Sequence, residues 1–366
     1  TPVPGPTAPA FSMAARSAHT CAITAAGGVT CWGSNTDGQL GDGTSLDRIF
    51  PVSVTGLTSS MTTLTAGSSH TCGLTEAGAV KCWGKNLDGQ IGDGGTTDRR
   101  SPVNVVGLTS GAVSVGAGSN HTCAVTATGG VRCWGNNSDG QLGDGGTTDR
   151  RAPVDVVGLA EGVISVAVGT NYSCAVTVTG GVQCWGINSD GQLGDGTTTD
   201  RRSPVQVSGI SSGITLVVAG ARHTCMLTDA GGVKCWGDNS DGQLGDGTIL
   251  GRRAPVDVTG LTSGVTAITA GSSHTCAITT AGGVRCWGNN SDGQLGDSTI
   301  FDRRLTVDVT GLSSGVTSVA AGSNHTCALT AAGAAQCWGQ NSLRQIGDGT
   351  TTDRRVPAEV VGYSTN

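Results

Sequence analysis

The sequence repeats every 51 residues, and this repeat restricts the possible folds more than any other feature of the chain. Each unit carries two cysteines ten positions apart, and a tryptophan directly follows the second cysteine. No insertion or deletion interrupts the register, so the array covers nearly all of the 366 residues. The seven pairs are Cys21 and Cys31, Cys72 and Cys82, Cys123 and Cys133, Cys174 and Cys184, Cys225 and Cys235, Cys276 and Cys286, and Cys327 and Cys337. The structure of one unit therefore decides the fold of the whole chain.

Each unit predicts four short β-strands. In the last copy, residues 316–322 alternate apolar and small side chains, and two further strand patterns at 325–330 and 334–339 are joined by a tight Ala/Gly turn. A long polar loop follows, and a short strand such as 307–311 completes a unit. Four strands repeated seven times predict an all-β fold, a closed seven-bladed β-propeller. A linear β-solenoid is the alternative, but its ends would need caps and a ring does not.

Two segments are expected along the chain. Residues 1–10 form a proline-rich lead, and residues 11–366 form a single propeller domain. The lead lacks the apolar centre of a signal peptide and the chain starts at Thr1, so we expect an N-terminus from which any targeting peptide has been removed. The sequence has no run of apolar residues long enough to span a bilayer, which predicts no insertion into a membrane.

The cysteine spacing favours a disulfide within each repeat. If residues 25–27 form a three-residue turn, Cys21 and Cys31 face each other across an antiparallel strand pair, within disulfide reach. A metal site would recruit His19, on the same strand face as Cys21, but in the fourth unit Tyr172 replaces this histidine while both cysteines remain. Buried free thiols are the third possibility. Disulfides imply an oxidising compartment, which is extracellular, at the cell surface or in the periplasm.

The histidines, the tryptophans and the polar loop also recur in the repeat, and we expect structural roles for them. We expect the six histidines to donate hydrogen bonds to neighbouring strands or loops, with a histidine ring around the channel as the alternative, and the seven tryptophans to pack between blades. The polar loop, residues 136–154 in the third unit, predicts turns in which Leu142 is the apolar anchor. Its aspartates are five residues apart, unlike the alternating ligands of a calcium loop, so we expect no metal site. The arginine pair after the loop predicts local Asp–Arg pairing.

The pattern HTCALT…CWG.N..GQLGDGTTTDRRSPV resembles the repeat of the regulator of chromosome condensation family, with its glycine–glutamine–leucine–glycine loop. The resemblance extends over residues 11–366, and the chain looks like a bacterial-type secreted member. It implies a seven-bladed propeller, in which strands from both chain ends often complete one blade. It also implies interaction with a partner rather than chemistry.

The equal length of the seven units argues against catalysis. An active site needs a nucleophile, a base and an orienting group at one place. No unit contains a longer loop that could supply these groups, so we expect neither catalytic residues nor a cofactor. A net charge of −6 disfavours nucleic acid as a partner. The expected function is a non-enzymatic extracellular or cell-surface scaffold for protein interaction or structure. The alternatives are a secreted inhibitor or lectin-like ligand-binding propeller and, third, a hydrolase or lyase with a site on the propeller face.

The best candidates for partner binding are positions where the copies disagree, because those residues are not needed to build a blade. The first group departs from the small polar consensus beside the histidine position of units four and five: Asn171, Tyr172 and Arg222. The second group replaces polar residues in the loops of units one, five and six: Leu46, Ile249, Leu250, Ile300 and Phe301. We expect some of the second group to be exposed and to dock another protein or a copy of this chain. The alternatives are neutral drift for the first group and, for the second, loops that fold back onto their own blades.

Overall fold

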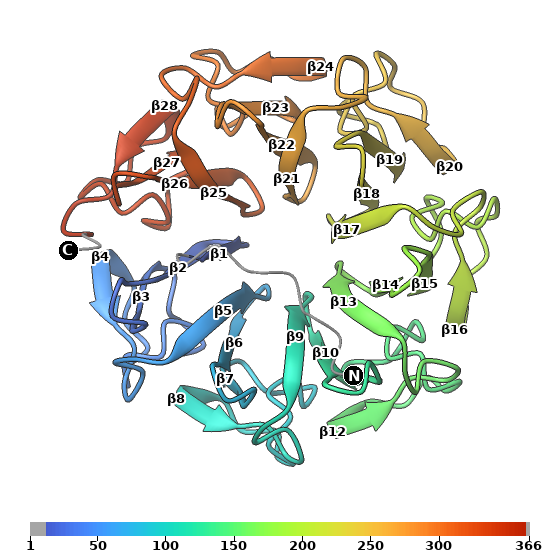
Figure 1. Cartoon of the computed structure of the whole chain (residues 1–366). Coiled ribbons are helices and arrows are strands. Elements are labelled where there is room, and N and C mark those ends of the chain that lie inside the picture. Colours follow the sequence, from blue (N-terminus) through green and yellow to red (C-terminus); the bar gives the residue numbers. More distant parts are fainter. Residues whose placement is uncertain (1–11, 364–366) are drawn as a thin grey trace.

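The structure is a ring of seven four-stranded β-sheets around a central channel (Figure 1). It is a computed structural model, and it describes residues 12–363. The predicted all-β seven-bladed propeller is confirmed, with one blade for each 51-residue repeat. The proline-rich lead predicted at residues 1–10 lies outside the described residues.

Within each blade the strands follow one another in sequence order from the channel to the outer edge, and neighbours are antiparallel. Blades 1 to 4 consist of β1 (Met13–Arg16), β2 (His19–Ile23), β3 (Val29–Gly33) and β4 (Arg48–Ser53); β5 (Met61–Ala66), β6 (His70–Thr75), β7 (Val80–Gly84) and β8 (Arg99–Asn104); β9 (Ala112–Ala117), β10 (His121–Thr126), β11 (Val131–Gly135) and β12 (Arg150–Asp155); and β13 (Val163–Val168), β14 (Tyr172–Thr177), β15 (Val182–Gly186) and β16 (Arg201–Gln206). Blades 5 to 7 consist of β17 (Ile214–Ala219), β18 (His223–Thr228), β19 (Val233–Gly237) and β20 (Arg252–Asp257); β21 (Val265–Ala270), β22 (His274–Thr279), β23 (Val284–Gly288) and β24 (Arg303–Asp308); and β25 (Val316–Ala321), β26 (His325–Thr330), β27 (Ala335–Gly339) and β28 (Arg354–Glu359).

The central hairpin of each blade has the register that the cysteine spacing predicts. In blade 1, Cys21 lies opposite Cys31. The Thr24 amide donates to the Gly28 carbonyl at 2.8 Å, and Gly27 in the turn has a φ of 75°, in the left-handed region that favours glycine. In every blade the paired cysteines have Cα atoms 4.0 to 4.1 Å apart and are joined by a disulfide.

The fourth strand of each blade begins earlier than predicted. The pattern at residues 307–311 suggested the strand, but β24 starts at Arg303 and ends at Asp308. Because this outermost strand is only half-buried, it tolerates a polar start, and its first residues do not show an apolar pattern. Val309 is buried just beyond the strand, so part of the predicted apolar pattern belongs to the turn.

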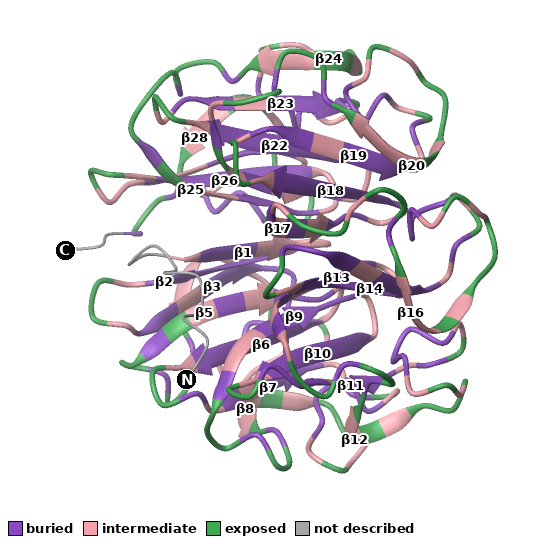
Figure 2. Ribbon diagram, turned by 45° about the vertical axis from the view of Figure 1, so that its right-hand side comes forward, coloured by how far each residue is buried: buried purple, intermediate pink, exposed green. Residues whose placement is uncertain are grey.

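The hydrophobic core lies between adjacent sheets. The second and third strands of each blade are largely buried, whereas the outer strand is half-buried (Figure 2). Trp83 of β7 is fully buried in one cluster with Leu40 and Val54 of blade 1, and its indole N–H donates to the Gln39 carbonyl at 2.9 Å. Leu40 is the blade 1 equivalent of Leu142, and both are fully buried. The predicted packing of tryptophans between blades and of the loop leucine inward is confirmed.

Among the residues that the structure describes, the ring closes without an exchange of strands between the two ends. Every sheet in residues 12–363 is one contiguous stretch, so the shared blade that the resemblance implied does not occur there. Blade 1 packs on blade 7 through the same tryptophan contact that joins the other blades. The Trp32 indole N–H donates to the Gln345 carbonyl at 2.9 Å, as Trp83 does to Gln39. The junction adds Tyr363, whose ring centroid lies 6.2 Å from that of Trp32, and an ion pair of 3.2 Å between Arg344 and Asp47.

Candidate functional site

Side-chain hydrogen bonds link the second strands of neighbouring blades all the way around the ring. In six blades the histidine that begins this strand places Nε2 2.9 to 3.0 Å from a hydroxyl oxygen of the next blade. The pairs are His19 with Thr71, His70 with Thr122, His121 with Ser173, His223 with Thr275, His274 with Thr326, and His325 with Thr20. The expected hydrogen bonding of the histidines to neighbouring strands is confirmed.

The hydroxyl partner determines which histidine nitrogen carries the proton. Thr71 donates its only hydroxyl proton to the Gln39 carbonyl at 2.8 Å, so its oxygen must accept the proton of His19 Nε2. The Nδ1 atoms of all six histidines are buried and have no hydrogen-bond partner among the described residues. Burial lowers the pKa of His19 to about 4 and that of His70 to about 3. These imidazoles are therefore neutral at neutral pH, and they link neighbouring blades.

Tyr172 belongs to this ring, and its prediction as an interface anchor is wrong. Its side chain is fully buried at the histidine position of blade 4. The phenol donates to the His223 carbonyl at 2.5 Å, and its oxygen lies 3.0 Å from the Thr224 hydroxyl, so the tyrosine replaces the missing histidine link. Gly169 makes room for the ring, because a Cβ there would lie 2.1 Å from Tyr172 Cε1.

The other two residues of that predicted group remain accessible. Arg222 has a side chain that is 68% exposed, and its Nε lies 4.0 Å from Asp190. Asn171 is half-buried and donates to Asp139 at 2.9 Å. Of the three residues predicted to bind a partner there, only the exposed Arg222 and the half-buried Asn171 could still contact one.

The long polar loops are held together by their own side chains. Asn137 accepts a hydrogen bond from the Leu142 amide and donates to Asp144. Burial by itself would raise the pKa of Asp144, but hydrogen bonds from Arg150 and from the Gly146 amide keep it below the usual range. The Asp144–Arg150 ion pair of 2.7 Å recurs at the matching positions of the other blades. The arginine thus pairs with an aspartate six residues earlier instead of the adjacent one, and the loop is a self-contained turn.

The second predicted group is exposed, as expected. Phe301 is 69% exposed, Leu46 64% and Leu250 62%, and Ile249 and Ile300 are also exposed. None of these side chains is buried against its own blade, because the loops have no apolar interior left to receive them.

Three outer-strand positions extend this surface and are not among the predicted site residues. Phe50 of β4, Leu305 of β24 and Val356 of β28 are exposed and occupy the same position in blades 1, 6 and 7. The other four blades have small residues there: Ser101, Ala152, Ser203 and Ala254. Phe50 and Leu305 reach towards the loop of the preceding blade, since a Cβ on Gly349 would lie 3.0 Å from the Phe50 ring and one on Gly247 3.6 Å from Leu305. An alignment of the copies could have revealed the pattern.

These residues together form what we call the apolar band. It follows the outer edge of the ring from blade 5 through blades 6 and 7 to blade 1, where β24, β28 and β4 lie in Figure 1. Its members are Leu46, Phe50, Ile249, Leu250, Ile300, Phe301, Leu305 and Val356.

No group of three or more histidine, cysteine, aspartate or glutamate side chains within residues 12–363 is arranged to hold a metal ion. The same residues contain no helix with the length and apolar character needed to cross a membrane.

The repeats match a known family. The regulator of chromosome condensation (RCC1) repeat matches residues 26–74, 77–125, 128–176, 179–227, 230–278 and 281–329. The ultraviolet-B receptor UVR8 of Arabidopsis thaliana is 32% identical over 96% of this chain and 82% of its own length. The secretion-regulating guanine nucleotide exchange factor of Bos taurus is 31% identical over 93% of this chain and 80% of its own length.

Solved structures support the same fold. The structure of yeast RCC1 (Prp20) bound to Kap60 superposes with a TM-score of 0.80 over 90% of this chain and 83% of that one, and its 20% identity shows the fold alone. The repeat matches cover most of the ring, and both sequence relatives align over more than nine-tenths of the chain. The chain therefore belongs to the family of propellers built from the regulator of chromosome condensation (RCC1) repeat.

Proposed function

We propose that this protein is a non-enzymatic protein-interaction scaffold that acts outside the cell, at the cell surface or in the periplasm. A disulfide in every blade supports an oxidising compartment, because such bonds are rare where thiols are kept reduced. Protein binding is supported by the relative yeast RCC1, whose structure was solved with Kap60 bound. The partner is another protein or a second copy of this chain.

The apolar band is the observation that carries the proposal. In blades 2 to 4 the matching loop positions are threonines, such as Thr147 and Thr148, so the fold does not need apolar residues there. Large apolar side chains in contact with water are unfavourable, and a continuous group of them is typical of a contact surface. The band crosses four adjacent blades and contains eight exposed apolar side chains, whereas the Arg222 position offers a single exposed side chain.

We predict that restoring threonine in the band removes association and leaves the fold intact. The variant is Ile249→Thr, Leu250→Thr, Ile300→Thr and Phe301→Thr combined. Because these side chains are exposed, the thermal unfolding midpoint should change by no more than a few degrees. Sedimentation velocity over a concentration series measures association between copies, and a pull-down from the extracellular fraction of the source organism measures association with other proteins.

The matched control is Val157→Thr with Val178→Thr. These two valines are 53% and 55% exposed on blades 3 and 4, outside the band, so their replacement should change neither readout. If the band variant associates as strongly as the unchanged protein in both measurements, the band is a variant of the loop and not an interface.

A further inference from the structure

Each blade has two free sheet edges. The first strand of a blade faces the channel, and the fourth strand lies at the outside of the ring (Figure 1). A free edge presents backbone N–H and C=O groups that pair readily with a strand of another molecule. Such pairing occurs unless something blocks the edge or closes it off.

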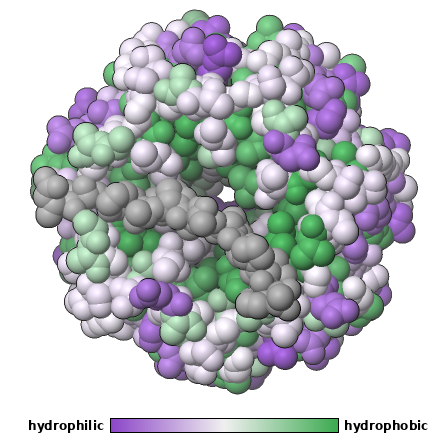
Figure 3. All heavy atoms as spheres, viewed as in Figure 1, coloured by the Kyte–Doolittle hydropathy of each residue, from purple (hydrophilic) through white to green (hydrophobic). Residues whose placement is uncertain are grey.

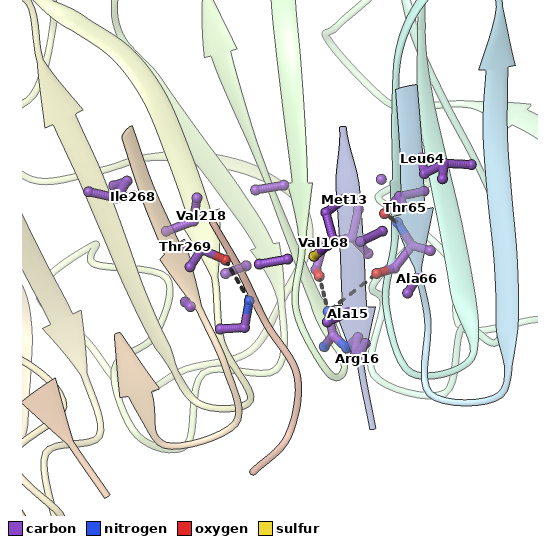
Figure 4. Close-up of a pocket in the computed structure, with 18 of the residues that line it drawn as sticks. Met13, Ala15, Arg16, Leu64, Thr65, Ala66, Val168, Val218, Ile268 and Thr269 are labelled. Carbon is purple, nitrogen blue, oxygen red and sulfur yellow. Dashed lines mark hydrogen bonds between the residues drawn. The ribbon is translucent and has the colours of Figure 1, made fainter. Parts of the chain in front are cut away.

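The inner edges are closed off from any partner. The channel that they face has a volume of about 390 Å³, and its opening is narrow in the space-filling view of Figure 3. The Arg16 side chain lines this channel, and its Nη1 donates to the Val168 carbonyl at 2.8 Å and to the Ala117 carbonyl at 3.2 Å (Figure 4). These bonds tie β1 to blades 4 and 3. The remaining space has no room for a strand of another protein.

A proline blocks the outer edge in six of the seven blades. Proline has no N–H to donate, and natural proteins place it on edge strands to prevent pairing between molecules. Blade 6 is the exception, because Thr306 of β24 stands where the others have proline. The prolines at this position of the fourth strand are Pro51, Pro102, Pro153, Pro204, Pro255 and Pro357.

Thr306 and Asp308 turn their backbone groups away from the blade. The Val309 N–H, just beyond β24, donates to the Val284 carbonyl of β23 at 3.0 Å, so Val309 turns inwards. Because directions alternate along a strand, Val307 also turns towards β23, whereas Thr306 and Asp308 turn outwards. The prolines of the other blades agree with this direction, since they offer no N–H to the third strand.

Loops cover the edge on either side of these two residues. The Arg304 carbonyl accepts a hydrogen bond from the Gly247 amide of blade 5 at 3.0 Å, and the Thr310 N–H donates to the Gly296 carbonyl at 3.0 Å. The uncovered edge therefore offers two donors and two acceptors. A partner strand that satisfies them needs two outward-facing residues of its own, with the same spacing.

We propose that the partner at the apolar band is a second copy of this chain, which pairs with the first along the outer edges of β24. This inference rests on the proposed function and identifies its partner. The two strands run antiparallel about a two-fold axis, so that Thr306 of each copy lies opposite Asp308 of the other. Each of these residues donates its N–H to the opposing C=O, which gives four hydrogen bonds and uses every free group. A shift of two residues would require the groups of Arg304 or Thr310 that the loops hold.

The side chains of β24 suit this register. Val307 of one copy faces Val307 of the other at the axis, and Leu305, which is 49% exposed, lies two residues along the strand. Pairing covers these apolar groups, which continue the apolar band. The Asp308 carboxylate is paired with Arg285 at 2.8 Å, which reduces the repulsion between the two copies of Asp308.

The deciding variant is Thr306→Pro, which restores the residue of the other six blades. It removes two of the four hydrogen bonds, so the dissociation constant of the dimer in sedimentation velocity should rise at least about tenfold. Because six blades fold with proline here, the thermal unfolding midpoint should stay within a few degrees. The matched control is Thr306→Val, which keeps the N–H and the branched shape and should change the dissociation constant by no more than about threefold.

Hydrogen–deuterium exchange of the unchanged protein gives a second readout that needs no variant. The amides of β24 should exchange more slowly above the dimerisation midpoint than below it, and those of β20, which contains Pro255, should not change. The inference is overturned if the protein stays monomeric, if Thr306→Pro dimerises as tightly as the unchanged protein, or if Thr306→Val weakens the dimer as much as Thr306→Pro. Protection of β20 in place of β24 would also overturn it.

The two proposals at this surface can fail separately. If the four-threonine variant of the band loses a different protein in the pull-down and Thr306→Pro retains it, the second-copy inference is wrong and the proposed function stands. If the four-threonine variant changes no association and Thr306→Pro changes none either, both are wrong.

Discussion

Reduction of the disulfides is expected to unfold this protein or to bring it close to unfolding. Each bond closes a hairpin whose two cysteines are 10 positions apart. By restricting the unfolded chain, a disulfide across a loop of that size adds about 3 kcal/mol to the free energy of unfolding. Seven such contributions exceed the net stability of about 5 to 15 kcal/mol that is common for folded proteins. The urea midpoint of the reduced, alkylated protein should therefore lie far below that of the oxidised protein.

The experiment needs denaturant during reduction, because every cysteine side chain is inaccessible in the folded ring. The unreduced chain should be lighter by about 14 Da than the reduced one, since each of the 14 cysteines loses one hydrogen. Removing one pair, Cys123→Ala with Cys133→Ala, serves as the graded control and should cost about 3 kcal/mol from the lost loop closure. Labelling of the unreduced, unfolded chain by a thiol reagent would contradict both the pairing and the proposed extracellular location.

Acidification from pH 6 to pH 5 is expected to lower the free energy of unfolding steeply. The six buried histidines have folded-state pKa values of about 3 to 4, whereas histidine in an unfolded chain titrates near 6.5. The unfolded chain therefore takes up protons first as the pH falls, so the stability is complete above about pH 6.5 and is lost towards pH 4. Each histidine would contribute about 1.4 kcal/mol per pH unit if the unfolded chain were fully protonated. Because the unfolded histidines are only about three-quarters protonated at pH 6, each contributes about 1.2 kcal/mol over this step, and six give a loss of roughly 7 kcal/mol. Aspartates such as Asp144 add to the loss only at lower pH, near their usual value of 3.8.

Two exchanges between histidine and tyrosine test the assignment of this effect to the ring. His70→Tyr copies the natural arrangement of blade 4 and removes one titrating group, so the dependence of the urea midpoint on pH should become shallower by about one-sixth. Tyr172→His adds a seventh buried histidine and should make it steeper by a similar amount. Urea midpoints measured from pH 7.5 to pH 4.5 provide the comparison. Equal slopes in all three proteins would show that the histidines do not control the acid response.

The sequence alone determined the architecture because each blade is built from local contacts. The opposition of Cys21 and Cys31 follows from the length of one turn, and the same hairpin recurs in every repeat. The burial of Leu142 follows from its being the only apolar residue in a polar loop. The exposure of Phe301 follows from the same lack of an apolar interior in the loop.

The tertiary structure decided what happens where one blade meets another or faces the channel. Tyr172 looked like a surface aromatic in the sequence, but it is buried because the next blade places His223 and Thr224 against its hydroxyl. Arg16 appeared to be an ordinary residue near the start of the chain, and only the closed ring brings the carbonyls of blades 3 and 4 to its side chain. Such contacts join residues more than fifty positions apart, and their geometry depends on the packing angle between sheets, which the pattern within one repeat does not contain.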